Sequence, residues 1–310
     1  MGTQVISQVL VIFILIALGF LCFKLKIATK ESASFLSSFT MKVTLPCLML
    51  SSFFRPFSRE LLRDAGIVLA IAFAAYALAF LIAWGYPRML RMKGPERGVH
   101  RYALIVPNSG FMGVPVVEGF LGSFYLFHVA VFNVPLTLLG FSIGLWLIAK
   151  EKGKTTTLSW KLFTNPPLLA TVIGFFVFLF SVPFPAPLEQ SIRLVGGTTT
   201  PLVMVIIGIS IAQADMRRML GRWQIYLTSF MRLFIFPALI ALLCILVGVS
   251  GNLSILLVLL VAMPVASSTA VIAAVYDVAV EEASSVIVFS TLLSMITIPL
   301  TILALNHLFG

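Results

Sequence analysis

One stretch of the chain, residues 106–115, places polar side chains and helix-breaking residues inside an apolar segment of membrane length. Its sequence is VPNSGFMGVP, and a continuous α-helix there would lose backbone hydrogen bonds at Pro107 and again at Pro115. An unpaired backbone group is costly in hydrocarbon, so such an interruption is tolerated only where it is buried in protein or lines an aqueous cavity. We therefore expect an interrupted helix beside a cavity.

The residues that follow Pro107 have the chemistry of a site for a small anion. The N-terminal end of a half-helix that restarts there carries about half a positive charge, which attracts anions. Asn108 and Ser109 add donors and acceptors, and Gly110 lets a ligand or another backbone approach closely. A kinked helix with a packing role is the alternative, because proline and glycine are common in membrane spans. We interpret Pro107, Asn108, Ser109 and Gly110 as substrate-binding residues.

A second interruption, Met263–Thr269, occurs at the corresponding place in the other half of the chain. Pro264 breaks the apolar run, and Ser267, Ser268 and Thr269 follow it. Two matching interruptions are the best sequence indication of a transporter's substrate site, so we assign these four residues to it as well. In the alternative, the hydroxyl groups bond back to carbonyls of their own helix, as they often do in membrane spans.

Three further polar residues lie within apolar segments. Asn133, one turn before Pro135, is suited either to contact the substrate or to form an interhelical hydrogen bond. A cation at the centre of a span costs about 2.5–3.5 kcal/mol, which makes Lys42 a candidate substrate ligand unless it reaches the membrane surface. Arg232 raises the same question, and for it we favour the surface position. We expect solvated positions near span ends for Glu118, Glu189 and Arg193.

The amino-acid composition indicates that lipid surrounds the segments that carry these residues. Of the 310 residues, 60% are hydrophobic and 10% are charged, and the mean hydropathy is +1.10. A soluble domain of this length cannot hide so much apolar surface, so we predict an all-α membrane protein. Its first apolar segment lacks a basic flank and a small-residue cleavage site, and we expect it to be retained. We predict ten spans, at about 4–23, 32–54, 65–87, 99–121, 124–149, 162–182, 189–212, 223–248, 254–276 and 284–307.

Basic residues gather in alternate loops and predict the orientation of the chain. One set of loops carries Lys24, Lys26, Lys30, Arg88, Arg91, Lys93, Arg97, Arg101, Lys150, Lys152, Lys154, Lys161, Arg217, Arg218 and Arg222. The opposite loops carry Arg55, Arg59, Arg63 and Arg193. By the positive-inside rule the first set is cytoplasmic, which predicts a multi-pass protein of the cytoplasmic membrane with both termini outside. This topology also explains the net charge of +10 without a nucleic-acid partner.

The two halves of the chain match weakly at a nearly constant offset. Pro107 corresponds to Pro264 and Phe132 to Phe289, both at an offset of 157 (264 − 107 and 289 − 132). A repeat of five spans must be inverted in the membrane because five is odd. We therefore predict a single transmembrane unit with inverted repeats at about 1–150 and 160–310.

Motifs for catalysis, metals and cofactors are missing from the sequence. Cys22, Cys47 and Cys244 are far apart in apolar runs, and no histidine has a partner at metal-ligand spacing. There is no GxSxG, HExxH or nucleotide-binding motif. No span has a central acidic residue of the kind expected in a proton or sodium relay. We expect neither an enzyme nor a bound metal or cofactor.

The stretch Pro107–Pro115 resembles the fourth-span signature of the auxin efflux carrier family, which includes plant auxin carriers and bacterial malonate and malate permeases. Leu45-Pro46, and Pro264 with Tyr276, are also similar to that family. The resemblance covers essentially the whole chain. It implies crossing of spans 4 and 9 at their breaks, a scaffold of spans 1, 2, 6 and 7, a transport domain of spans 3–5 and 8–10, elevator-type motion and a homodimer.

The short 150–161 loop is typical of compact bacterial members, because many plant members have a long cytoplasmic loop there. Val265 and Ala266 stand where plant carriers have more polar or smaller groups, which argues against auxin as the substrate. The resulting prediction is a secondary carrier for a small mono- or dicarboxylate, most simply an exporter. Two alternatives stay open at this point: a sodium-coupled symporter of the bile-acid type, and a membrane sensor that binds a ligand without moving it.

Overall fold

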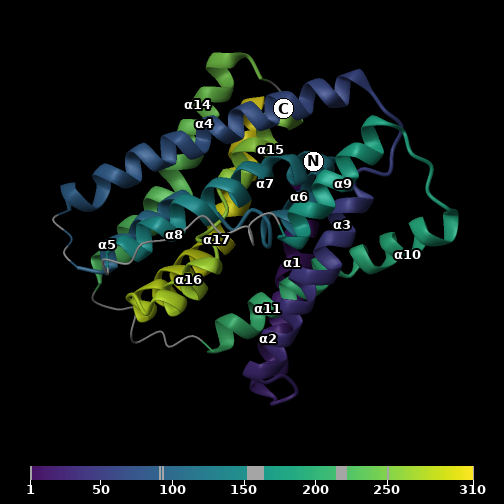
Figure 1. Ribbon diagram of the computed structural model, residues 1–310. Coiled ribbons are helices and arrows are strands. Elements are labelled where there is room, and N and C mark those ends of the chain that lie inside the picture. The colour runs from purple at the N-terminus through teal and green to yellow at the C-terminus, as the bar shows by residue number, and fades with distance from the viewer. Residues whose placement is uncertain are drawn as a thin grey trace. The chain divides into compact units, whose positions relative to one another are not determined.

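The computed structural model describes residues 2–90, 92, 94–151, 164–213, 222–249 and 251–309 (Figure 1). Within these residues the chain is helical, and the β-type pairing is a single isolated bridge. The α-helices are α1 (Gly2–Lys24), α2 (Lys30–Phe39), α3 (Leu45–Ser51), α4 (Arg59–Met89), α5 (Glu96–Ile105), α6 (Gly113–Leu121), α7 (Leu126–Pro135), α8 (Phe141–Lys150), α9 (Pro166–Leu179), α10 (Ala186–Gly197), α11 (Thr199–Gln213), α13 (Trp223–Phe230), α14 (Phe236–Val247), α15 (Gly251–Val261), α16 (Ser268–Tyr276) and α17 (Val280–Phe309). Of the basic loop residues, Arg91, Lys93, Lys152, Lys154, Lys161, Arg217 and Arg218 lie outside the described residues.

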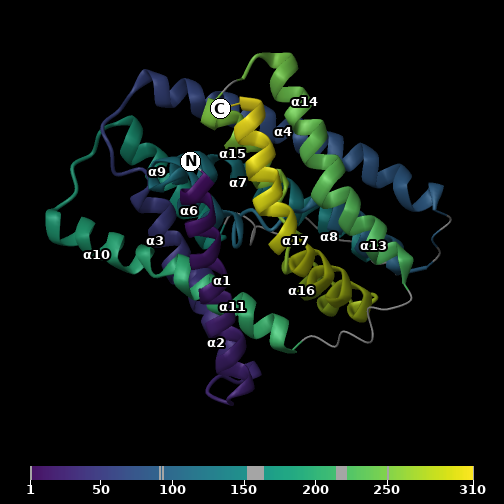
Figure 2. The same ribbon diagram turned by 180° about the vertical axis from the view of Figure 1, so that it is seen from behind.

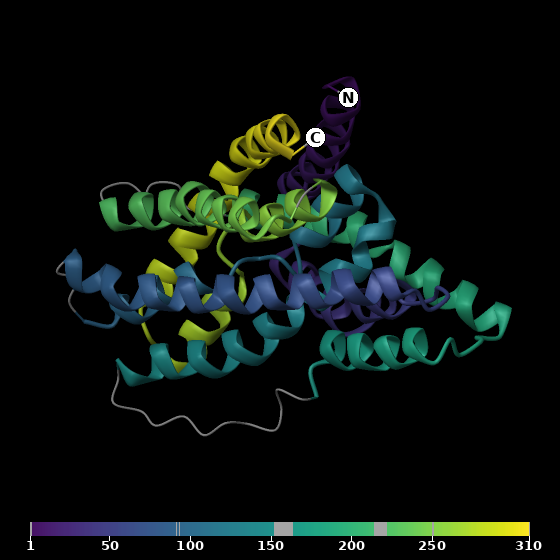
Figure 3. The same ribbon diagram turned by 90° about the horizontal axis from the view of Figure 1, so that it is seen from above.

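Seven helical segments within the described part of the chain are long and apolar enough to cross a membrane. The longest is α4, which runs as one continuous rod despite Pro87 in its last turn (Figure 3). The expected spans 99–121 and 254–276 are each built from two short helices, and 162–182 contains the shorter apolar helix α9. The all-helical membrane protein is confirmed, whereas ten spans in an inverted repeat stay a prediction.

Three of the expected spans contain a π-helical turn. These turns are η1 (Thr40–Thr44), η3 (Leu136–Gly140) and η5 (Met231–Ile235). A proline follows η1 and η5 closely, at Pro46 and Pro237. Proline lacks the N–H of the regular ladder and its ring crowds the preceding turn, which favours a wider turn just before it. The two intramembrane cations of the sequence lie in these turns: Lys42 in η1 and Arg232 in η5.

The chain divides into two compact units. Unit 1 comprises Met1–Ile67, Gly110–Val134 and Phe163–Ala214. In it α1 packs on α11 at very short range: a Cβ atom added to Gly208 would lie 2.0 Å from the Ile16 carbonyl oxygen. Such contacts are typical of membrane helices, which associate through small residues that let backbones approach. The unit's core includes the edge-to-face rings of Phe53, Phe127 and Phe178.

Unit 2 comprises Val68–Ser109, Pro135–Leu162 and Asp215–Gly310. Helix α5 packs against α8 and α17, and α17 also packs against α13, α15 and α16 (Figure 2). An ion-pair cluster joins α5 to the end of α8, because Glu151 accepts hydrogen bonds from Arg97 and Arg101. Two expected spans are interrupted, and each consists of two short helices. Of these four helices, α5, α15 and α16 belong to unit 2, and α6 belongs to unit 1.

Candidate functional site

The first interruption follows α5. This helix ends at Ile105, Val106 is extended (φ −106°, ψ 102°), and helical structure resumes with α6 at Gly113. Pro107 is the residue that prevents continuation, as the sequence predicts. The second expected loss, at Pro115, does not occur, because Pro115 lies in the first turn of α6, where a backbone N–H has no helical partner to lose.

The second interruption separates α15 from α16. Helix α15 ends at Val261, and α16 begins at Ser268. Pro264 lies in the non-helical stretch between them. The sequence-based prediction of a break at Pro264 agrees with this geometry.

The two interruptions pair with each other inside unit 2. Pro107 and Val265 form an isolated antiparallel bridge. On its two sides, the Asn108 N–H donates to the Pro264 carbonyl at 2.8 Å, and the Ala266 N–H donates to the Val106 carbonyl at 3.2 Å. Each interrupted segment therefore provides hydrogen-bond partners for some backbone groups of the other, and this lowers the cost of non-helical backbone within an apolar layer.

A side chain from α17 completes this backbone pairing. The Val265 N–H donates to the Ser290 hydroxyl at 3.1 Å. Ser290 is fully buried and follows Phe289, which the internal repeat matched to Phe132. Its hydroxyl accepts a hydrogen bond from the Val265 N–H, which the break leaves without a helical partner.

Arg232 holds the carbonyl ends of both interrupted helices. Its guanidinium donates to the carbonyl of Leu104 at 2.9 Å, of Val261 at 2.6 Å and of Met263 at 3.2 Å. The side chain is 1% exposed, so our expectation that Arg232 would extend to the membrane surface was wrong. The physical reason is that the last carbonyls of α5 and α15 need donors, and a guanidinium supplies five in a fixed fork.

This arrangement has a definite electrostatic consequence. The C-terminal ends of α5 and α15 each carry about half a negative charge, and the unit positive charge of Arg232 offsets the two together. The N-terminal end of α16 faces the same non-helical stretch, and the Ser267 side chain does not cap it. About half a positive charge therefore remains at the start of α16, which favours an anion.

The predicted site residues of unit 2 differ in how accessible they are. Ser267 is exposed, and Asn108 is half-buried with no hydrogen bond from its amide side chain to any described residue. Ser268 is half-buried and its hydroxyl contacts the Tyr102 hydroxyl at 3.1 Å. Ser109 and Thr269 are fully buried, and Thr269 donates back to the Ala266 carbonyl at 2.7 Å.

The other predicted site residues, Gly110, Asn133 and Lys42, belong to unit 1. The Asn133 amide donates to the Val129 carbonyl at 2.8 Å, and its oxygen lies 3.7 Å from where a Cβ atom on Gly110 would be. Lys42 is exposed on η1. Within the described residues no group of three His, Cys, Asp or Glu side chains has the geometry of a metal site.

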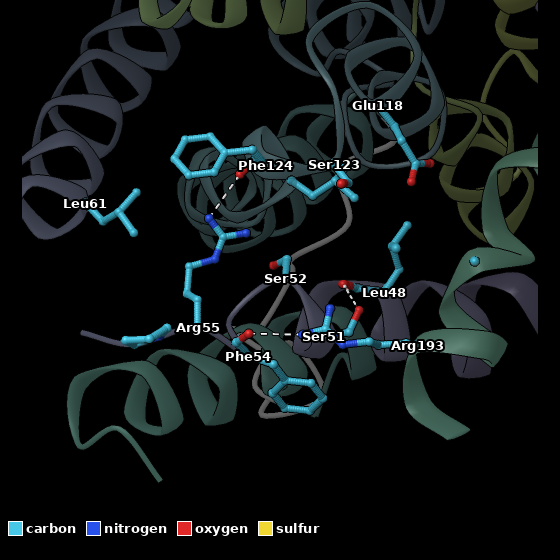
Figure 4. A pocket seen from close by; sticks show the side chains of 13 residues that line it. Leu48, Ser51, Ser52, Phe54, Arg55, Leu61, Glu118, Ser123, Phe124 and Arg193 are labelled. Atoms are coloured by element: carbon cyan, nitrogen blue, oxygen red, sulfur yellow. Dashed lines mark hydrogen bonds between the residues drawn. The ribbon is translucent and has the colours of Figure 1, made fainter. Parts of the chain in front are cut away.

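Unit 1 contains a cavity of about 640 Å³ that the sequence did not indicate (Figure 4). Arg55 and Arg193 face it, and they donate to the carbonyls of Phe124 at 3.3 Å and Phe54 at 3.0 Å. Partial burial and the neighbouring Arg193 lower the pKa of Arg55 from its ordinary value, although an arginine stays charged at neutral pH. The cavity is thus lined by two cations and by the Glu118 carboxylate.

Three acidic and basic residues expected near span ends have structural partners in unit 1. Glu118 lines the cavity and accepts from the Thr200 hydroxyl at 2.5 Å. Arg193 forms an ion pair with Glu189 at 2.8 Å, with both side chains partly exposed. The expected solvation therefore holds for Glu189 and Arg193, and Glu118 is instead tied to α11.

Comparison with known proteins supports a role in transport. A family model described as membrane transport protein matches residues 4–157 and 149–302. An uncharacterized transporter from Methanothermobacter thermautotrophicus is 27% identical over 95% of this chain and 96% of its own length. A second uncharacterized transporter, from Methanocaldococcus jannaschii, is 22% identical over 94% and 96%. A Rhizobium meliloti protein named "Putative malonate transporter" is 25% identical over 95% and 94%. With the family model matching nearly the whole chain, this protein belongs to the auxin efflux carrier family of membrane transport proteins.

Proposed function

We propose that this chain is a secondary carrier for a small organic anion, a mono- or dicarboxylate of the size of malonate. The observation that carries the proposal is the pairing of the two interruptions in unit 2, with Arg232 bound to the carbonyl ends of α5 and α15. Membership in a family of membrane transport proteins supports the transport activity, and the name of the Rhizobium meliloti relative suggests the substrate class.

The charge balance at the interruptions favours an anionic substrate over a cationic one. Arg232 neutralises the carbonyl ends that would repel an anion, and the start of α16 stays positive. Asn108 and Ser267 supply accessible polar groups beside it. In our proposal the substrate carboxylate accepts hydrogen bonds from these two side chains and from backbone N–H groups at the start of α16.

The transport cycle that we propose is of the elevator type. A transport domain of spans 3–5 and 8–10 carries the anion past a scaffold of spans 1, 2, 6 and 7, in a homodimer of the cytoplasmic membrane whose termini lie outside. Net export is the direction that the family resemblance favours. The proposal includes the crossing of spans 4 and 9 at the paired interruptions.

The decisive experiment is transport of radiolabelled malonate by purified protein in proteoliposomes, alongside a panel of other carboxylates, with and without sodium. Asn108→Ala removes a hydrogen bond to a charged group, worth about 1.5–3 kcal/mol, so affinity should fall roughly 10- to 100-fold. Asn252→Ala, an exposed amide of α15, is the matched control and should leave affinity unchanged.

Each alternative has its own outcome. Saturable flux by the purified protein excludes a sensor that binds without transport, and a strict requirement for sodium would favour the symporter of the bile-acid type. Equal affinity of wild type and Asn108→Ala across every transported carboxylate would refute the site.

A further inference from the structure

A second polar cluster is buried in unit 2, at the end of α5 away from the interruption. His100 is fully buried. Its Nδ1 lies 2.8 Å from the Thr228 hydroxyl of α13, and its Nε2 lies 2.9 Å from a carboxylate oxygen of Glu282 in α17. Glu282 is 2% exposed. An ionisable pair buried this deeply is a candidate functional site.

Further charged and polar groups surround this pair. The second carboxylate oxygen of Glu282 accepts from Arg222, and Arg222 also pairs with Glu96 at 3.3 Å. Glu281 acts electrostatically on Arg222 from the same turn of α17. From α4, the Tyr86 hydroxyl lies 2.9 Å from the Thr228 hydroxyl. On the side of α5 that packs against α8, Arg97 and Arg101 each form an ion pair with Glu151. The charged group that directly contacts the imidazole is the Glu282 carboxylate.

Both nitrogens of the His100 ring have hydrogen-bond partners in either protonation state of the ring. In the neutral ring, Nε2–H donates to Glu282, Nδ1 accepts from the Thr228 hydroxyl, and Thr228 accepts from Tyr86. When a proton is added to Nδ1, that nitrogen donates to Thr228, whose own hydrogen turns toward the Tyr86 oxygen. Adding a proton therefore leaves both ring nitrogens of His100 with acceptors, and the hydroxyl hydrogen of Tyr86 must turn away from Thr228.

The elements that hold this pair also hold the interrupted backbones. Helix α5 carries His100 and, four residues later, Leu104, whose carbonyl binds Arg232. Thr228 lies four residues before Arg232 along the same helical run. Helix α17 carries both Glu282 and Ser290, the residue that binds the Val265 N–H. A change of charge at His100 thus acts on the helices whose ends shape the proposed anion site.

We propose that His100, together with Glu282, is a proton-binding site that couples anion transport to protons. This inference rests on the proposed function. His100 lies roughly 9 Å of helix before Val106, taking about 1.5 Å per residue. At an effective dielectric constant of about 20, a unit charge at about that distance changes the affinity for an anion about tenfold. Protonation should strengthen anion binding, and by linkage anion binding should favour protonation, which is the behaviour of a proton–anion symporter. Such a carrier exports the anion when the outward anion gradient exceeds the inward proton gradient, and imports it otherwise.

Proton binding can be measured without any substrate. The chain has three histidines, so ¹⁵N-histidine-labelled protein in detergent micelles gives three sets of imidazole signals, assigned with His100→Gln, His128→Gln and His307→Gln. We expect the His100 ring to take up a proton, and so to change from the neutral to the imidazolium pattern, in a series of spectra recorded from about pH 8 down to about pH 5. A His100 ring that keeps one pattern over that whole range would overturn the proposal, whether or not malonate is the substrate.

The coupling is tested with radiolabelled malonate in proteoliposomes. Wild type should bind malonate about tenfold more tightly at low pH and accumulate it when an inward proton gradient is imposed. His100→Gln keeps a polar side chain and should still exchange malonate, but without the pH dependence of affinity and without gradient-driven accumulation. His307→Gln, an exposed residue near the end of α17, should behave as wild type. A pH profile shared by His100→Gln and wild type would refute the coupling.

Two further variants keep the test informative if His100→Gln fails to fold. Glu282→Gln removes the carboxylate that stabilises the imidazolium, so the pH dependence should move to lower pH. Thr228→Val removes the acceptor for a proton on Nδ1 and should act in the same direction. Unchanged pH profiles in both variants would count against the site. If malonate is not transported at all while His100 titrates as expected, the proposed substrate fails and the proton site stands.

Discussion

Replacing Arg232 should destabilise unit 2 strongly, because its guanidinium is the donor for three buried carbonyls. Arg232→Met keeps the length and the apolar contacts of the side chain but removes every donor. Each carbonyl left without a partner costs about 1–3 kcal/mol. Three such carbonyls together cost about 3–9 kcal/mol, and part of that loss is offset because a charged guanidinium no longer has to be buried. We adopt about 3–5 kcal/mol as the expected loss.

The assay is thermal unfolding of the purified protein in detergent, followed by intrinsic tryptophan fluorescence. At roughly 2–4 °C per kcal/mol, Arg232→Met should lower the unfolding midpoint by about 10 °C. The unfolding midpoint of Arg232→Lys should lie between those of wild type and Arg232→Met, because an ammonium keeps the charge but lacks the planar fork that reaches several carbonyls at once. Arg63→Met, an exposed arginine, is the control and should change stability by no more than about 0.5 kcal/mol.

One result would refute this reasoning. If Arg232→Met unfolds within a degree or two of wild type, the carbonyl ends of α5 and α15 have adequate partners without the guanidinium. The charge balance that we derived at the interruptions would then need another source, and the proposed attraction for an anion would lose its main support. Loss of transport with unchanged stability would instead assign Arg232 to substrate binding.

The remaining predictions concern helix packing and the polar residues of the second interruption. Gly208→Ala should prevent recovery of monodisperse protein by size-exclusion chromatography, because the added Cβ would meet the Ile16 carbonyl at 2.0 Å; Gly66→Ala, with open space around it, should be tolerated. Thr269→Val should leave the malonate affinity within about twofold of wild type, since its hydroxyl is fully buried and already donates to the Ala266 carbonyl just before α16. Ser267→Ala, at an exposed position, should weaken malonate binding several-fold, and the reverse ranking of these two variants in a transport assay would contradict the site geometry.

The two breaks could be predicted from the sequence because the prolines that favour them act locally, although proline alone does not fix a break: Pro87 and Pro299 lie inside continuous helices. Pro107 and Pro264 lack an N–H, so no arrangement of neighbours lets a regular helix continue through them with a complete hydrogen-bond ladder. The apolar composition likewise determined a helical membrane protein, since only internal backbone pairing is available in lipid. The resemblance at Pro107–Pro115 identified the family, and the match over the whole chain confirmed it.

The fate of the polar side chains was decided by tertiary structure alone. Whether Arg232 reaches the surface or turns inward depends on carbonyls 31 and 128 residues away in sequence, at Met263 and Leu104, which no local pattern reveals. In the same way His100 and Glu282, separated by 182 residues, become a buried pair only because α5 and α17 pack together. Local chemistry favours the places where a helix stops, whereas the partner of a buried charge depends on which distant helix ends pack beside it.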